Sequence, residues 1–104
     1  MLHPTVLANL PQIEELCRRF HVCRLELFGS GTSDAFDPAT SDFDFLVQFA
    51  LPPDASALRS YFGLKEDLES LLGRKVDLVA PGKIINPYLA RTVEASREVV
   101  YEAA

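Results

Sequence analysis

Two aspartates separated by one residue, Asp42 and Asp44, are the side chains of this sequence best placed to do chemistry. They begin the segment 42–49, whose aromatic and branched residues are typical of a β-strand. In a strand, side chains at positions i and i+2 lie on one face, roughly 6.5–7 Å apart. Two carboxylates held in this way can share or flank one divalent cation, and hard oxygen ligands of this kind suit Mg²⁺ or Mn²⁺. The segment therefore predicts a metal site on one face of the strand, with Phe43 and Phe45 on the opposite, apolar face.

A third acid, Asp77, lies in another apolar segment, between Val76 and Leu78. The segment 75–79 reads as a strand that stops before a Pro-Gly pair. If this strand is the neighbour of 42–49 in a sheet, Asp77 joins Asp42 and Asp44 as a third metal ligand. The alternative is a solvent-exposed carboxylate, or one that pairs with Lys75.

A small polar loop that begins with Gly29 and Ser30 follows the predicted strand 22–28. Glycine lets the backbone approach a phosphate closely, and the serine hydroxyl and the loop N–H groups can hold phosphate oxygens. A Gly-Ser pair alone is a turn in most proteins. Its position directly before the strand with two aspartates favours a phosphate site, because nucleotide chemistry needs phosphates beside metals.

Strands and helices are predicted to alternate along the chain, and this alternation favours an α/β or α+β fold. We expect a single domain over residues 1–104, with a small mixed β-sheet of about four strands packed with helices. Asn9 is expected to cap the first helix, and Gly73 to end the second. The predicted strands are 22–28, 42–49, 75–79 and 99–101, and the predicted helices run from Asn9 to about Phe20, over 55–72 and over 86–96.

Composition and charge exclude several classes of protein. The chain has 104 residues and a net charge of −5, with 48% hydrophobic and 24% charged residues, as in ordinary globular domains. It has no basic stripe for nucleic acid and no apolar run of the ~20 residues that a membrane span needs.

Cys17 and Cys23 lack further ligands for zinc and are expected to be reduced packing residues of a cytoplasmic protein. Between Arg24 and Arg59 the chain has no basic residue but six acids, which favours a bound cation over a solvated acidic loop; the six are Glu26, Asp34, Asp37, Asp42, Asp44 and Asp54.

The motifs together resemble those of a known family. Leu27-Phe28-Gly29-Ser30, followed after eleven residues by Asp42-Phe43-Asp44-Phe45-Leu46-Val47, is similar to the signature of the DNA polymerase β-type nucleotidyltransferase superfamily. The small size, the segment 73–79 and the ending 97–101 resemble its minimal nucleotidyltransferase (MNT) branch. The resemblance covers about residues 12 to 102 and implies the nucleotidyltransferase fold.

The resemblance also implies roles for the candidate residues. Asp42, Asp44 and Asp77 would be catalytic and would bind Mg²⁺ or Mn²⁺, and Asp77 would also activate the acceptor hydroxyl. Gly29 and Ser30 would hold the phosphates of ATP, the substrate. Many MNT proteins are antitoxins paired with a HEPN ribonuclease, which implies transfer of AMP to a tyrosine of that partner within a hetero-oligomer, with no direct nucleic-acid or membrane partner.

Two alternatives stay open from the sequence. The loop after Ser30 lacks the basic residues that are usual in the family, which favours an antitoxin that neutralises its partner by binding, with little or no catalysis. A nucleotidyltransferase that modifies a small molecule is the other alternative, and at this length its acceptor pocket would need another subunit.

Overall fold

A computed structural model of the chain describes residues 3–28, 43–80 and 97–103. These residues form a four-stranded mixed sheet of strand order β3-β2-β1-β4, in which β1 is antiparallel to β2 and β4 and β2 is parallel to β3. The predicted fold class is thereby confirmed. The helices are α1 (Pro4–Ala8), α2 (Leu10–Arg19) and α3 (Ala57–Leu72), and the strands are β1 (Val22–Phe28), β2 (Phe43–Phe49), β3 (Val76–Val79) and β4 (Glu98–Glu102).

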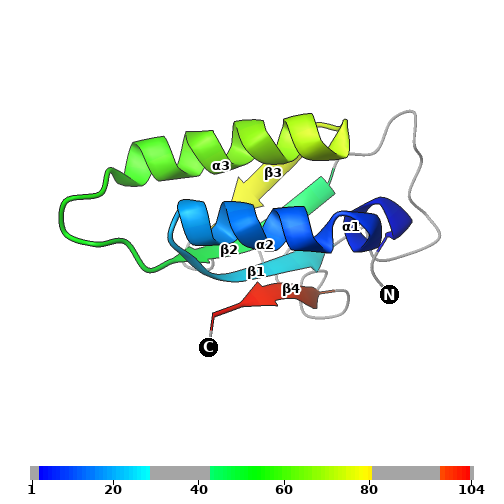
Figure 1. The fold of residues 1–104 in the computed structure, drawn as a ribbon, viewed down its shortest axis with the longest axis horizontal. Helices are drawn as coiled ribbons and strands as arrows, with labels where there is room; N and C mark the ends of the chain where they lie inside the picture. Colours follow the sequence, from blue (N-terminus) through cyan, green and yellow to red (C-terminus); the bar gives the residue numbers. More distant parts are fainter. Residues whose placement is uncertain (1–2, 29–42, 81–96, 104) are drawn as a thin grey trace, which may run out of the picture.

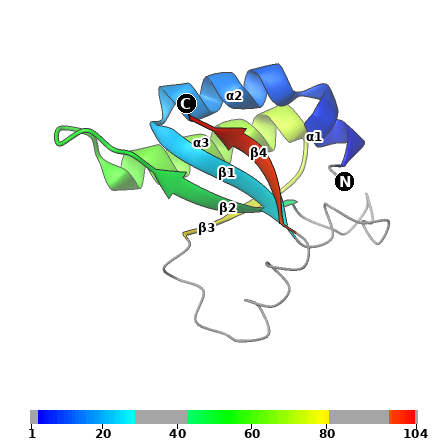
Figure 2. The same cartoon turned by 90° about the horizontal axis from the view of Figure 1, so that it is seen from below.

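The two long helices, α2 and α3, lie side by side along the same face of the sheet (Figures 1 and 2). The main core fills the space between them and that face. Because strand side chains alternate between faces, every second residue of β2 enters this core. The buried residues of the core are Val6, Ile13, Leu16, Cys17, Val22, Leu25, Leu27, Phe43, Phe45, Val47, Leu64, Leu68, Leu72, Val76, Leu78 and Val100.

Helix α3 begins and ends at residues whose chemistry explains its limits. The Ser56 side chain accepts a hydrogen bond from the backbone N–H of Arg59 at 3.2 Å, which satisfies a donor of the first turn. At the other end Gly73 has φ 68°, the left-handed conformation that glycine adopts without a Cβ penalty. The predicted end at Gly73 is confirmed, and the helix begins two residues later than predicted.

Two details differ from the sequence prediction. Asn9 precedes α2 but its side chain makes no cap; instead its Nδ2 donates to the carbonyl oxygen of Thr5 in the short helix α1, which was not predicted. The spacing of Leu58 and Phe62 predicts that both belong to the apolar stripe of α3, but they are 68% and 49% exposed because they face away from the sheet. The helix predicted over 86–96 lies outside the described residues.

Both cysteines are free, and Cys17 is fully buried beside the sheet. This agrees with the prediction that they are reduced packing residues. Burial, with a smaller contribution from Glu14, raises the pKa of the Cys17 thiol to about 12. Among the helices that the structure describes, none is long and apolar enough to cross a membrane.

Iodoacetamide at about pH 8 is expected to alkylate Cys23 well before Cys17. Only the thiolate reacts, and a pKa of about 12 leaves about one Cys17 thiol in ten thousand ionised at this pH. In addition, Cys17 is fully buried, whereas Cys23 is partly exposed. Mass spectrometry of timed samples measures both rates, with urea-unfolded protein as the control in which both thiols react. Equal rates in the folded protein would contradict the buried position of Cys17.

Candidate active site

Asp44 and Asp77 lie side by side on neighbouring strands. In the parallel pair β2–β3 they are register partners, and Phe28 of β1 is the register partner of Asp44 on its other side. The sheet therefore places Phe28, Asp44 and Asp77 in one row across three strands. This is the juxtaposition that the sequence predicted if the two acidic strands were neighbours.

Both carboxylates project from the face of the sheet turned away from α2 and α3, which we call the far face. The strand neighbours of the two aspartates, such as Phe43 and Val76, are fully buried on the helical face. Because side chains alternate, Asp44 and Asp77 must point the other way. Asp44 is partly exposed and Asp77 is exposed, so both are open to a ligand from solvent.

The donor set fits a hard divalent cation, since two carboxylates on adjacent strands offer the oxygen ligands that Mg²⁺ and Mn²⁺ prefer. The other predicted site residues, Asp42, Gly29 and Ser30, lie outside the described residues. Within the part of the chain that the structure describes, no cluster of three or more His, Cys, Asp or Glu side chains forms a metal site. The described residues thus provide two of the three predicted metal ligands.

An apolar floor adjoins the two carboxylates on the far face. Phe28, Leu46 and Val79 pack together there as a second small cluster, separate from the main core. A strand phenylalanine such as Phe28 is typical of a main core, so this separate floor was not predicted from the sequence. The signal was present in the strand alternation, because Leu46 and Val79 each lie two residues beyond one of the aspartates.

Side chains of α3 hold the backbone of β3 on both sides of Asp77. The Tyr61 hydroxyl donates to the carbonyl oxygen of Leu78 at 2.9 Å, and the Val76 N–H donates to Glu69 Oε2 at 3.0 Å. Lys65 Nζ lies 3.1 Å from the same Glu69 oxygen. Neither contact with β3 was predicted from the sequence.

These contacts shift two pKa values in opposite directions. The hydrogen bond from Val76, assisted by Lys65, lowers the pKa of the Glu69 carboxyl because both favour its charged form. The hydrogen bond to Glu69 raises the pKa of Lys65, and the Asp77 carboxylate adds to this effect. Lys65 therefore remains a cation close to the acidic pair.

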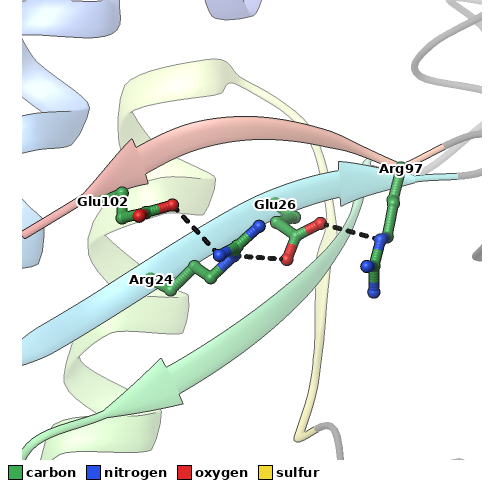
Figure 3. Close-up of polar contacts among 4 residues, drawn as sticks. All are labelled: Arg24, Glu26, Arg97 and Glu102. Atoms are coloured by element: carbon green, nitrogen blue, oxygen red, sulfur yellow. Dashed lines mark hydrogen bonds and ion pairs between the residues drawn. The ribbon is translucent and has the colours of Figure 1, made fainter.

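A buried carboxylate, Glu26, lies on β1 beside the apolar floor and is 4% exposed. Its Oε1 accepts a 2.7 Å hydrogen bond from Arg24 Nε, and its Oε2 lies 3.4 Å from Arg97 Nε (Figure 3). Arg24 also pairs with Glu102 of β4 at 3.0 Å. In the sequence, Glu26 is one of the six acids that favour a bound cation. In the structure the charge of Glu26 is instead balanced by Arg24 and Arg97.

A shallow groove runs between α2 and α3. Its lining residues belong to α2 and α3, which cover the face of the sheet opposite Asp44 and Asp77, so it cannot hold a group that reacts at the carboxylates. Its lining residues are Pro11, Gln12, Glu15, Leu16, Arg19, Asp67, Ser70 and Leu71.

In metal-free buffer of low ionic strength, Asp77→Asn is expected to stabilise the protein. The change removes one of two like charges on register partners, which is worth a few tenths to about 1 kcal/mol and raises the melting temperature by roughly 1–6 °C. Thermal unfolding by circular dichroism measures the shift. Asp54→Asn, an exposed loop carboxylate, is the matched control and should leave the midpoint unchanged; a lower midpoint for Asp77→Asn would contradict the repulsion.

The stability contributed by Glu69 is expected to disappear in acid. Because folding lowers the pKa of Glu69 below its ordinary value of 4.5, this contribution is complete above pH 4.5 and is lost as the pH falls through the lower folded value. Urea unfolding of wild type and Glu69→Gln should therefore give free energies of unfolding that differ at about pH 6 and converge as the pH falls below 4.5. A difference that does not change with pH would show that the charge of Glu69 contributes nothing.

Comparison with known proteins identifies the family of this domain. Residues 12–100 match the family model of the nucleotidyltransferase domain. The protein adenylyltransferase MntA of Thermococcus cleftensis is 40% identical over 88 residues, which cover 85% of this chain and 82% of the relative.

Two solved structures share the fold. A protein assigned as a minimal nucleotidyltransferase is 31% identical, with a TM-score of 0.69 over 94% of this chain and 95% of its own. A chain from the complex of a tri-AMPylated Shewanella oneidensis HEPN toxin with an MNT antitoxin is 22% identical, with a TM-score of 0.62 over 94% of this chain and 73% of its own. The fold, the row of carboxylates and the family model lead to one conclusion: the chain belongs to the nucleotidyltransferase domain family, as its sequence motifs predicted.

Proposed function

We propose that this protein is an antitoxin-type adenylyltransferase, which transfers AMP from ATP to a tyrosine of a HEPN ribonuclease toxin. The observation that carries the proposal is the register pairing of Asp44 with Asp77 on the far face of a nucleotidyltransferase domain. The name of its 40% identical relative supports a protein as the acceptor. The AMP-carrying toxin in the structurally similar complex supports a HEPN partner and a hetero-oligomer.

The residues divide into two groups by role. Asp44 and Asp77, with Asp42 as the third acid, are the ligands for Mg²⁺ or Mn²⁺. Gly29 and Ser30 hold phosphate oxygens of ATP. A bound divalent cation supplies positive charge that offsets the charge developing on the transferred phosphoryl group. The apolar floor of Phe28, Leu46 and Val79 limits the access of water to one side of the carboxylates.

Asp77 is also the base of the proposed reaction. The tyrosine oxygen attacks the α-phosphorus of ATP and forms a new O–P bond, while the bond from this phosphorus to the bridging oxygen breaks and pyrophosphate leaves. The hydroxyl proton passes to the carboxylate of Asp77. This residue suits the role because it is exposed and lies on an edge strand, where the side chain of another protein can reach it.

Asp44→Asn and Asp77→Asn are each expected to reduce AMP transfer at least about a hundredfold, because the metal contributes several kcal/mol to the transition state and each 1.36 kcal/mol is tenfold in rate. The assay incubates the protein with α-phosphate-labelled ATP, Mg²⁺ and extract of the source cell, and follows the label by gel and mass spectrometry. Asp54→Asn is the matched control, since this loop carboxylate is exposed and lies outside the described site.

The outcomes separate the proposed function from its alternatives. Label on a tyrosine of one HEPN protein, lost in both site variants and after addition of EDTA, supports the proposal. Label in a small molecule keeps the nucleotidyltransferase activity but replaces the acceptor. Capture of a partner without any transfer by the wild type would overturn the catalytic proposal in favour of an antitoxin that acts by binding.

A further inference from the structure

We propose that Tyr61 and Glu69 of α3 are positioning residues for Asp77, which hold the backbone of β3 on both sides of Asp77 and so keep it beside Asp44. We call Tyr61, Lys65 and Glu69 the α3 clamp. The inference rests on the proposed function, because it concerns the same pair of carboxylates. It adds residues that are not proposed as ligands and that act through the backbone of β3.

Strand β3 needs a restraint beyond its pairing with β2. It has four residues, lies at the edge of the described sheet, and pairs in parallel, which is slightly less stable per residue than antiparallel pairing. A slip of one residue would turn Asp77 onto the helical face, and a slip of two would move it about 6.6 Å along β2. Either slip would separate Asp77 from Asp44.

The clamp binds the backbone groups of β3 that point away from β2. The Phe43 N–H donates to the carbonyl oxygen of Lys75 at 3.1 Å, so Lys75 faces β2. Because successive residues of a strand alternate, Val76 and Leu78 direct their backbone groups to the open edge. These are the groups that Glu69 and Tyr61 bind.

The two clamp bonds bracket Asp77 in the sequence. Glu69 accepts from the residue before it at 3.0 Å, and Tyr61 donates to the residue after it at 2.9 Å. An edge strand normally leaves such groups to water or to another strand. Here side chains of α3 bind both groups, so the backbone on either side of Asp77 is tied to the helix.

The helix presents the clamp on a rigid stripe. Tyr61, Lys65 and Glu69 are four residues apart in sequence, which places them along one side of α3. The adjacent stripe of Leu64, Leu68 and Leu72 is buried in the main core and fixes the helix on the sheet.

Within the clamp, Lys65 orients the acceptor oxygen. Its Nζ contacts the same Glu69 Oε2 that accepts from Val76, at 3.1 Å. A charge-assisted hydrogen bond is stronger and more directional than a neutral one. The contact therefore holds Glu69 toward β3 and keeps the cation near Asp77.

The experiment compares wild type with Glu69→Ala, Glu69→Gln and Tyr61→Phe. Glu69→Gln keeps an oxygen that can accept from the Val76 N–H, and Tyr61→Phe removes only the hydroxyl. Two controls separate positioning from general stability. Glu66→Ala removes an exposed carboxylate of the same helix, and Leu64→Val lowers stability through the buried stripe without touching the backbone bonds of β3.

Two readouts are independent of AMP transfer. The first is the affinity for Mn²⁺ with AMP-PNP, followed by electron paramagnetic resonance well below the unfolding temperature. The second is hydrogen exchange of the Asp77 amide, which the strand alternation directs toward β2.

Glu69→Ala is expected to weaken Mn²⁺ and AMP-PNP binding about tenfold and to speed exchange at Asp77, as loss of a residue that supports a metal ligand does. Glu69→Gln should restore most of both values, and combining Tyr61→Phe with Glu69→Ala should lower affinity further than either change alone. Glu66→Ala and Leu64→Val should leave the affinity unchanged.

Wild-type affinity in Glu69→Ala, or an equal loss in Leu64→Val, would overturn the positioning role and leave the proposed function intact. A different outcome is that the wild type binds Mn²⁺ and AMP-PNP in a manner that depends on Glu69 but transfers no AMP. That result would overturn the proposed function and support the clamp. A wild type that binds neither would overturn both, because no metal site would exist for the clamp to position.

Discussion

The parallel pairing of β2 with β3 brings two like charges side by side, and the rest of the structure holds that pairing in place. Asp44 and Asp77 repel each other by about 1 kcal/mol or less while exposed to water. On the opposite face of the same strands Phe43, Phe45 and Leu78 are buried, and each contributes roughly 1.5–3 kcal/mol. Burial on the helical face therefore outweighs repulsion on the far face. A divalent cation bound between the two carboxylates would remove this repulsion.

Both edges of the described sheet are secured by side chains. At β3 the securing residues are Tyr61 and Glu69, which occupy backbone groups that would otherwise pair with another strand. At β4 the Arg24 guanidinium of β1 pairs with both the buried Glu26 carboxylate of β1 and the Glu102 carboxylate of β4 (Figure 3). This ion pair joins the two strands. The two edges thus both depend on polar side chains, which bind backbone groups at β3 and pair with each other at β4.

The strands and the acidic pair could be predicted from the sequence because both depend on the alternation of strand side chains between the two faces of a sheet. That alternation sets Asp77 opposite the buried residues of β3 and makes it a neighbour of Asp44 once the strands are adjacent. The buried face of α3 could be predicted only in part. Phe62 is apolar and lies at helical spacing from the buried leucines, but only the three-dimensional packing shows that it faces solvent. The contacts of Tyr61 and Glu69 with β3 could not be predicted, since they join side chains to backbone groups whose direction depends on the sheet register.

The position of the acidic pair favours an acceptor carried by another macromolecule. A small acceptor needs walls to orient it, and among the described residues the groove lies across the sheet from the carboxylates. Asp77, by contrast, stands exposed on an edge strand, where a protruding side chain of a partner can approach without entering a cavity. If the acceptor belongs to a partner protein, as proposed, that protein would supply orientation that the described residues do not. Asp44, Asp77 and the α3 clamp would then supply the fixed geometry that the acceptor meets.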